Sequence, residues 1–100
     1  MTVSVQVVYW RDIPAQIKLR AGRERLARPL SERFQQAIDA AAMRAGVAQD
    51  DAYLAEWRSS DWPERDGDLA EVASALVAQL EADYPDERLT ALAARGGRES

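Results

Sequence analysis

The hydrophobic and polar positions at the start of the chain alternate on both sides of a short polar break. Residues 3–10 and 15–21 place apolar side chains at every second position, and the break between them contains Pro14. Alternation of period two predicts β-strands with one buried face, and proline lacks the N–H that a strand interior needs. The pattern therefore predicts a β-hairpin in which Tyr9 and Trp10 point to opposite faces of the first strand.

Apolar residues next recur at intervals of three and four, which is the spacing of a helix with one buried face. This stripe runs through residues 30–45. Ser31 is a suitable N-cap, and Gly46 stands where a left-handed residue would close the last turn. We expect the first helix between these two residues.

A second helical stripe covers residues 69–84. Asp68 and Glu71 fit a capping box at its start, and Pro85 ends it. Asp86 can then cap a short last helix that extends through residue 92. The two long stripes predict the two main helices of the fold.

The sequence pattern indicates the secondary structure of the segments between these elements less clearly. Residues 53–58 alternate and predict a third strand, although a one-turn helix is an alternative in so short a window. Residues 23–29 form a polar, basic linker, and residues 59–68 have the composition of a loop. The expected order is β-β-α-β-α-α, an α+β two-layer sandwich with a three-stranded sheet covered on one face by two helices. We expect one domain over residues 1–95 and a frayed tail over 96–100.

Composition excludes several kinds of chemistry. The chain has 100 residues, with 47% hydrophobic and 30% charged residues, but no cysteine and no histidine. Disulfides, thiolate nucleophiles and histidine-based acid–base catalysis are thereby excluded. Because no catalytic motif is present either, we expect a protein that is not an enzyme. No apolar run reaches the roughly 20 residues that span a bilayer, and the N-terminus does not resemble a secretory signal, so we expect a cytoplasmic protein.

Charge is distributed unevenly. Residues 11–33 carry a net charge of +4, whereas the chain from residue 39 onward carries −8. One interpretation is a surface for nucleic acid or another phosphate-bearing ligand, built from Arg20, Arg23, Arg25 and Arg28. The other is a solvated strand face, which the acidic balance of the whole chain favours.

Acidic and glycine residues give no further site. The carboxylates at residues 61, 64, 66 and 68 do not fit the spacing of a calcium loop and are better interpreted as helix caps. The glycines are too scattered to cradle phosphate. We expect neither a metal nor a cofactor.

Four segments resemble a known family. YWRDIPAQ (9–16), RFQ (33–35), IDAAAM (38–43) and YLAEW (53–57) are similar to the small bacterial family named virulence factor and to the domain appended to conserved virulence factor C proteins of Gram-positive bacteria. The resemblance covers about residues 5–85. It implies no known reaction and no catalytic residues; an accessory role beside folate- or corrinoid-linked one-carbon enzymes is implied by association.

These observations lead to three hypotheses of function. The first is an accessory module that binds a protein partner through an outward-facing surface of Trp10, Arg11, Asp12, Gln16 and Arg33. We then expect Trp10→Ala and Arg11→Ala to leave the melting temperature nearly unchanged and to abolish partner binding. The second is nucleic-acid or phospholigand binding through the basic 18–33 segment. The third is an enzyme that uses Asp12 or Asp39 with Arg11 in a shared pocket.

Overall fold

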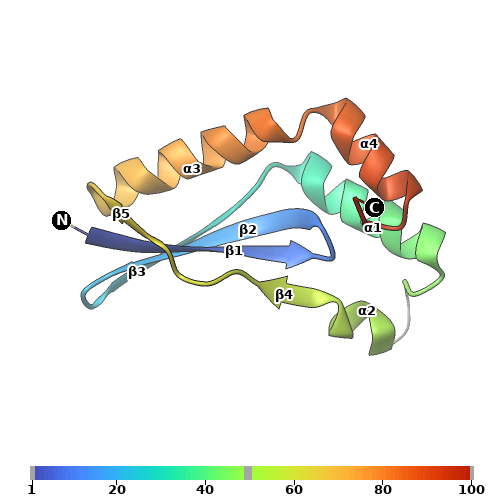
Figure 1. The fold of residues 1–100 in the computed structure, drawn as a ribbon, viewed down its shortest axis with the longest axis horizontal. Coiled ribbons are helices and arrows are strands. Elements are labelled where there is room, and N and C mark those ends of the chain that lie inside the picture. Colours follow the sequence, from blue (N-terminus) through green and yellow to red (C-terminus); the bar gives the residue numbers. More distant parts are fainter. Residues whose placement is uncertain (1, 49–50, 100) are drawn as a thin grey trace.

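The hairpin lies at the centre of the fold (Figure 1). In the computed structural model, which describes residues 2–48 and 51–99, β1 (Thr2–Trp10) pairs antiparallel with β2 (Ile13–Ala21). Arg11 and Asp12 form the hairpin turn, and Arg11 has a left-handed backbone with φ of 53°. The pairing is irregular between Val8 and Tyr9, where Ala15 is skipped in the register. The predicted hairpin is confirmed.

The sheet has five strands in the described residues, so the prediction of three strands is wrong. The order is β3-β2-β1-β4, and β5 also pairs with β1. The predicted linker is β3 (Glu24–Pro29), and the predicted loop contains β5 (Glu64–Asp66). β3 is an edge strand whose residues are almost all exposed, so it has no apolar alternation to reveal it.

The predicted third strand is also corrected. Its first half is a one-turn helix, α2 (Asp51–Ala55), and only its end pairs with β1 as β4 (Trp57–Ser59). For the first half of residues 53–58, the alternative of a one-turn helix was therefore a better prediction than the strand. The observed order is β-β-β-α-α-β-β-α-α rather than β-β-α-β-α-α.

The longer helices follow the sequence pattern closely. They are α1 (Glu32–Ala45), α3 (Leu69–Asp83) and α4 (Asp86–Ala94). Gly46 ends α1 with φ of 75°, and the Asp68 carboxylate accepts the N–H groups of Ala70 and Glu71 at the start of α3. None of the described helices is both long enough and apolar enough to cross a membrane.

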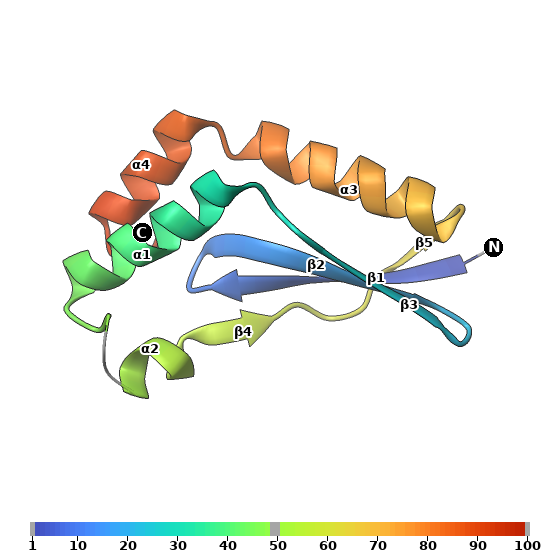
Figure 2. The same ribbon diagram turned by 180° about the vertical axis from the view of Figure 1, so that it is seen from behind.

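These three helices cover one face of the sheet (Figures 1 and 2). α3 packs on β2 and β3, while α1 packs on β2 and on α4. The core between the layers includes Ile17, Leu19, Phe34, Ile38 and Leu76. Complete burial of such a side chain contributes about 1.5–3 kcal/mol, so this apolar layer holds the domain together.

The other face of the sheet is largely uncovered. Cross-strand register places Gln6 beside Lys18, Lys18 beside Ala27, and Arg20 beside Arg25 on this side. Lys18, Arg20, Arg25 and Ala27 are exposed. We call this surface the open face; α2 lies at its far end, beyond β4 (Figure 1).

Candidate functional site

Trp10 does not face outward as predicted. It is 0% exposed, and its indole N–H donates to the carbonyl of Tyr53 at 2.9 Å. The Tyr53 ring lies 5.5 Å from it, and Gly97 packs against its edge. α2 and the C-terminal residues cover this end of the hairpin, so the expectation of an exposed Trp10 is wrong.

Arg11 is also largely internal. Its guanidinium donates to the carbonyl of Gly96 at 2.9 Å and pairs with Glu56 at 3.4 Å, and its side chain is only 13% exposed. Its backbone N–H donates to the carbonyl of Glu56. The Nε atom is buried and has no partner among the described residues. Through these contacts Arg11 connects the hairpin turn to Glu56, which lies between α2 and β4, and to the C-terminal segment.

Asp12 completes this connection. One carboxylate oxygen accepts the N–H of Glu99 at 2.8 Å, and the other pairs with Arg58 at 3.3 Å. The backbone N–H of Asp12 donates to the carbonyl of Gly97. The described part of the expected tail, residues 96–99, therefore lies packed against the hairpin turn.

A crevice of about 380 Å³ opens beside the hairpin turn and is lined by Tyr9, Asp12, Arg58, Ser60, Tyr84 and Glu99. The guanidinium of Arg58 lies 4.5 Å from the Tyr9 ring, and that of Arg88 lies 4.0 Å from the Tyr84 ring. Burial raises the pKa of the Tyr84 phenol above its ordinary value. This hydroxyl therefore stays protonated at neutral pH and can hydrogen-bond a partner, but it does not act as a base there.

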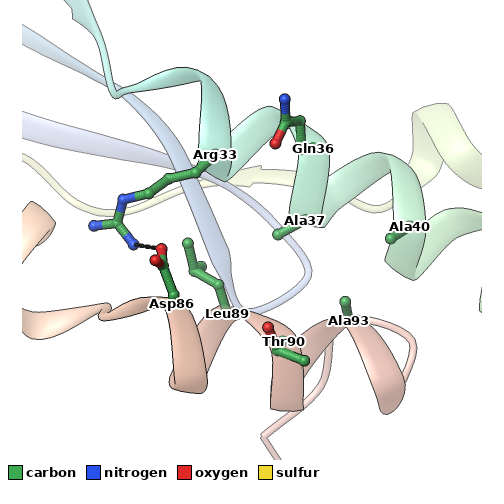
Figure 3. A pocket seen from close by; sticks show the side chains of 8 residues that line it. All are labelled: Arg33, Gln36, Ala37, Ala40, Asp86, Leu89, Thr90 and Ala93. Carbon is green, nitrogen blue, oxygen red and sulfur yellow. Dashed lines mark hydrogen bonds and ion pairs between the residues drawn. The ribbon is translucent and has the colours of Figure 1, made fainter.

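Arg33 lies at the junction of three helices. It donates to the carbonyls of Glu81, in the last turn of α3, and of Tyr84, the residue that caps this helix, where helix carbonyls lack partners, and it pairs with Asp86 at 3.2 Å. Figure 3 shows this pair at one end of a groove between α1 and α4. The backbone of Tyr84 links Arg33 to the crevice beside the hairpin turn.

Glu81 forms the other half of this junction. Burial alone would raise the pKa of its carboxyl. Hydrogen bonds from the backbone and hydroxyl of Ser31, together with Arg33, outweigh that cost and lower the pKa below its ordinary value. Ser31 thus uses its side chain to bind Glu81 rather than to cap α1.

The remaining predicted residues lie elsewhere. Gln16 is half-buried on the open face, paired with Val8 and Pro29. Asp39 is exposed on α1 and accepts from Gln35, so the pocket predicted to join it with Arg11 is absent from the part of the chain that the structure describes. Of the five predicted contact residues, the hairpin turn brings together Arg11 and Asp12.

The open face carries a second group of predicted residues. Arg20 on β2 stands directly opposite Arg25 on β3, and Lys18 lies two positions before Arg20 on β2. A groove of about 510 Å³ is lined by Gln6, Lys18, Leu19, Arg25, Leu26, Ala27 and Trp62. The guanidinium of Arg20 lies 4.2 Å from the centre of the Trp62 ring. The side chains around this groove are mainly cationic and apolar.

The cations of the chain fall into two groups, those that pair with a described carboxylate and those, around this groove and elsewhere, that do not. Arg11, Arg33, Arg58, Arg88 and Arg98 each pair with a carboxylate. Within residues 2–48 and 51–99, no carboxylate pairs with Lys18, Arg20 or Arg25. Like charges directly opposite on neighbouring strands are destabilising. The Arg20–Arg25 pair therefore carries an electrostatic cost that an anion would relieve.

The four arginines predicted as one basic surface are divided by the fold. Arg20 and Arg25 share the open face, whereas Arg23 lies in the turn between β2 and β3. Arg28 stands opposite Ile17 and borders a hollow against α3. The meeting of Trp62 with Lys18 and Arg20 was not predicted, because residues 59–68 were interpreted as a loop and not as a segment that pairs along β1. Among the described residues, no group of acidic side chains is placed to hold a metal.

Comparison with known proteins adds the family. The family model described as virulence factor matches residues 8–93, from the end of β1 to α4. No curated protein and no solved structure matches the chain. The match spans most of the residues that build the sheet, the helices and the hairpin turn, and on this basis the chain belongs to the virulence factor family.

Proposed function

We propose that this member of the virulence factor family is a binding module that takes a phosphate-bearing ligand on the open face. The observation that carries the proposal is the Arg20–Arg25 pair, two like charges held opposite one another with no described carboxylate paired with either. A guanidinium offers donors in a planar fork that matches phosphate oxygens. A phosphate bound between the two arginines would attract both guanidinium groups and so offset their mutual repulsion.

The groove suits such a ligand in size and chemistry. Its volume of about 510 Å³ falls within the range of small-molecule sites. Lys18 and Arg25 supply positive charge, Gln6 supplies an amide, and Ala27 and Trp62 supply apolar surface. This set of side chains supports recognition of the ligand, and the proposal therefore includes no catalysis.

Two arginines on the same strand give a matched test. Arg25 and Arg28 are both exposed on β3 but lie on opposite faces of the sheet. We expect inorganic pyrophosphate to shift the backbone amide NMR signals of residues 18–20 and 25–27 and to leave those of α4 unchanged. Arg25→Gln should weaken this binding at least fivefold, whereas Arg28→Gln should change it less than twofold. Equal losses in the two variants, or no shifts on the open face, would reject the proposal.

A protein partner at the hairpin turn is a second candidate. The crevice beside the turn favours it, because polar side chains line it, among them the half-exposed Arg58. Affinity purification from the native host should yield a partner that Glu99→Lys removes and Glu87→Lys retains. Loss of the partner with both variants, despite unchanged melting temperatures, would contradict this surface.

Two features of the proposed module rest on the sequence alone. A cytoplasmic location and an accessory role beside folate- or corrinoid-linked enzymes stay predictions. Cell fractionation and co-purification with such an enzyme would test them.

A further inference from the structure

We infer that the ligand of the open face is a single strand of nucleic acid, with one base stacked on the Trp62–Arg20 platform and neighbouring phosphates held by Lys18, Arg20 and Arg25. This inference rests on the proposed function and names its ligand class. It is carried by the position of Trp62 relative to the unpaired cations.

Trp62 comes from the loop between β4 and β5, which runs along β1. The N–H of Ser60 donates to the carbonyl of Val7, and the N–H of Val5 donates to the carbonyl of Pro63. The side chain of Gln6 also holds the loop, through the carbonyl of Ser60 at 2.9 Å. β1 lies between this loop and β2, so Trp62 must extend across β1 over the open face to meet Arg20.

The guanidinium of Arg20 lies over the indole ring, with its central carbon 4.2 Å from the ring centre. Trp62 is only partly buried, so this stacked pair is a partly exposed platform. Unpaired bases stack on aromatic rings and on arginine planes in complexes with single strands. The loop hydrogen bonds fix the platform in place before a ligand arrives, which reduces the entropic cost of binding.

The cations are spaced along the path that a strand would follow from this platform. Lys18 and Arg20 lie about 6.6–6.8 Å apart along β2, because each strand residue advances about 3.3–3.4 Å. Arg25 lies beside Arg20 on the neighbouring strand. The three cations are thus close enough to bind successive phosphates while a base occupies Trp62.

Two other polyanions fit the surface less well. In a duplex the bases are paired and stacked inside, so none reaches the Trp62 ring. An acidic peptide would satisfy the cations but leave the platform unused. A single strand is the polyanion that uses the charges and the platform together.

The helix layer restricts binding to this one face. Residues 69–94, which form α3 and α4, carry five acidic residues and one basic residue. At the other edge of the open face, Glu64 and Asp66 on β5 stand opposite Ser4 and Thr2. These carboxylates repel phosphate, so they mark the limits of the site. The net charge of −4 therefore does not exclude a local nucleic-acid surface.

Fluorescence anisotropy with labelled ten-nucleotide strands tests the inference. We expect a single strand to bind at least about fivefold more tightly than an abasic strand of equal length or than the duplex. RNA and DNA versions identify which sugar the site accepts, and either one supports the inference. With three phosphate contacts, the affinity for a single strand should fall about 20-fold between 50 and 200 mM salt.

Variants of the platform separate base stacking from charge. Trp62→Ala should weaken single-strand binding by about 5- to 150-fold, the range typical of one base–aromatic stack, and Trp62→Phe should restore most of it. Both changes should weaken binding of the abasic strand and of pyrophosphate much less than binding of the normal strand, because these two ligands have no base to stack on the ring. The inference would be overturned if the protein bound normal and abasic strands equally well, or if Trp62→Ala bound the normal strand as tightly as the unchanged protein does. Either result would leave the proposed phosphate binding on the open face intact. If neither strand binds and pyrophosphate also fails to shift the open face, both the inference and the proposed function are rejected.

Discussion

Gly97 and Trp10 are in direct contact at the closed end of the hairpin. A Cβ atom at Gly97 would lie 2.9 Å from Cζ3 of Trp10, closer than real Cβ atoms approach another heavy atom. Gly97 has φ of +92°, and its carbonyl accepts the N–H of Asp12. The absent side chain is what allows the C-terminal segment to cover the indole.

This contact predicts that Gly97→Ala is strongly destabilising. The new methyl group clashes with Trp10, and alanine is strained at a positive φ. Together these effects should reduce the free energy of unfolding by about 2–4 kcal/mol, measured by urea denaturation. Gly22→Ala is the control, because Gly22 has φ of +60° but its added methyl group would meet nothing within 4 Å. It should cost about 1 kcal/mol. If both variants reduced the free energy of unfolding equally, the C-terminal segment would have moved to relieve the clash with Trp10.

Trp10→Ala should unfold or nearly unfold the domain, contrary to the expectation from the sequence that it leaves the melting temperature unchanged. Removing a buried tryptophan costs about 3–5 kcal/mol, a large part of the total stability of a domain of this size. Trp62→Ala should cost less than about 1 kcal/mol because Trp62 is only partly buried in a loop. Thermal melts of the two variants followed by circular dichroism provide the comparison. A melting temperature for Trp10→Ala equal to that of Trp62→Ala would contradict the core role of Trp10.

Glu81→Gln should give a pH-dependent loss of stability. Folding lowers the pKa of Glu81 below its ordinary value of 4.5. The ionised carboxylate therefore stabilises the fold at pH values above 4.5. This contribution disappears as the pH falls through the pKa that Glu81 has in the folded protein. The variant should therefore lose about 1–2 kcal/mol at pH 7 and progressively less below about pH 4.5. Urea denaturation of both proteins between pH 7 and pH 3 measures the difference. A difference that stays constant over this range would rule out the proposed ionic contribution.

The Asp12–Arg58 pair should contribute little by itself. Arg58 is 53% exposed and Asp12 is 34% exposed, so solvent screens their attraction. A double-mutant cycle with Asp12→Asn and Arg58→Gln should give a coupling energy of about 0.2–1 kcal/mol that decreases in 1 M salt. A coupling above about 2 kcal/mol, insensitive to salt, would instead indicate a desolvated pair.

Periodicity predicted the elements that bury an apolar face. β1, β2, α1 and α3 each repeat large apolar residues at strand or helix spacing, and their bounds differ little from the predicted ones. β3 was missed because an edge strand needs no apolar stripe, and its arginines are typical of a linker. β4 and β5 have three residues each, which is too short for any alternation to be recognised.

The error at Trp10 has a different origin. Alternation correctly placed Tyr9 and Trp10 on opposite faces, and the prediction of an exposed Trp10 assumed that only one face is covered. α2 and residues 96–97 supply a second cover at the hairpin turn. The Gly96-Gly97 pair was the available signal, because two glycines allow both a close approach and a positive φ; they were interpreted as the start of a frayed tail.

The opposite charges of the two layers have a consequence for how the molecule meets a polyanion. Acidic α3 and α4 lie on one side of the sheet (Figure 1), and the register places Lys18, Arg20 and Arg25 on the other, which gives the domain an electric dipole moment across its thickness. In the electric field of a negatively charged strand, the domain would rotate during diffusion until its cationic side faces the strand. Productive encounters would then be more frequent than random orientation allows, and the association rate would fall as salt screens the field.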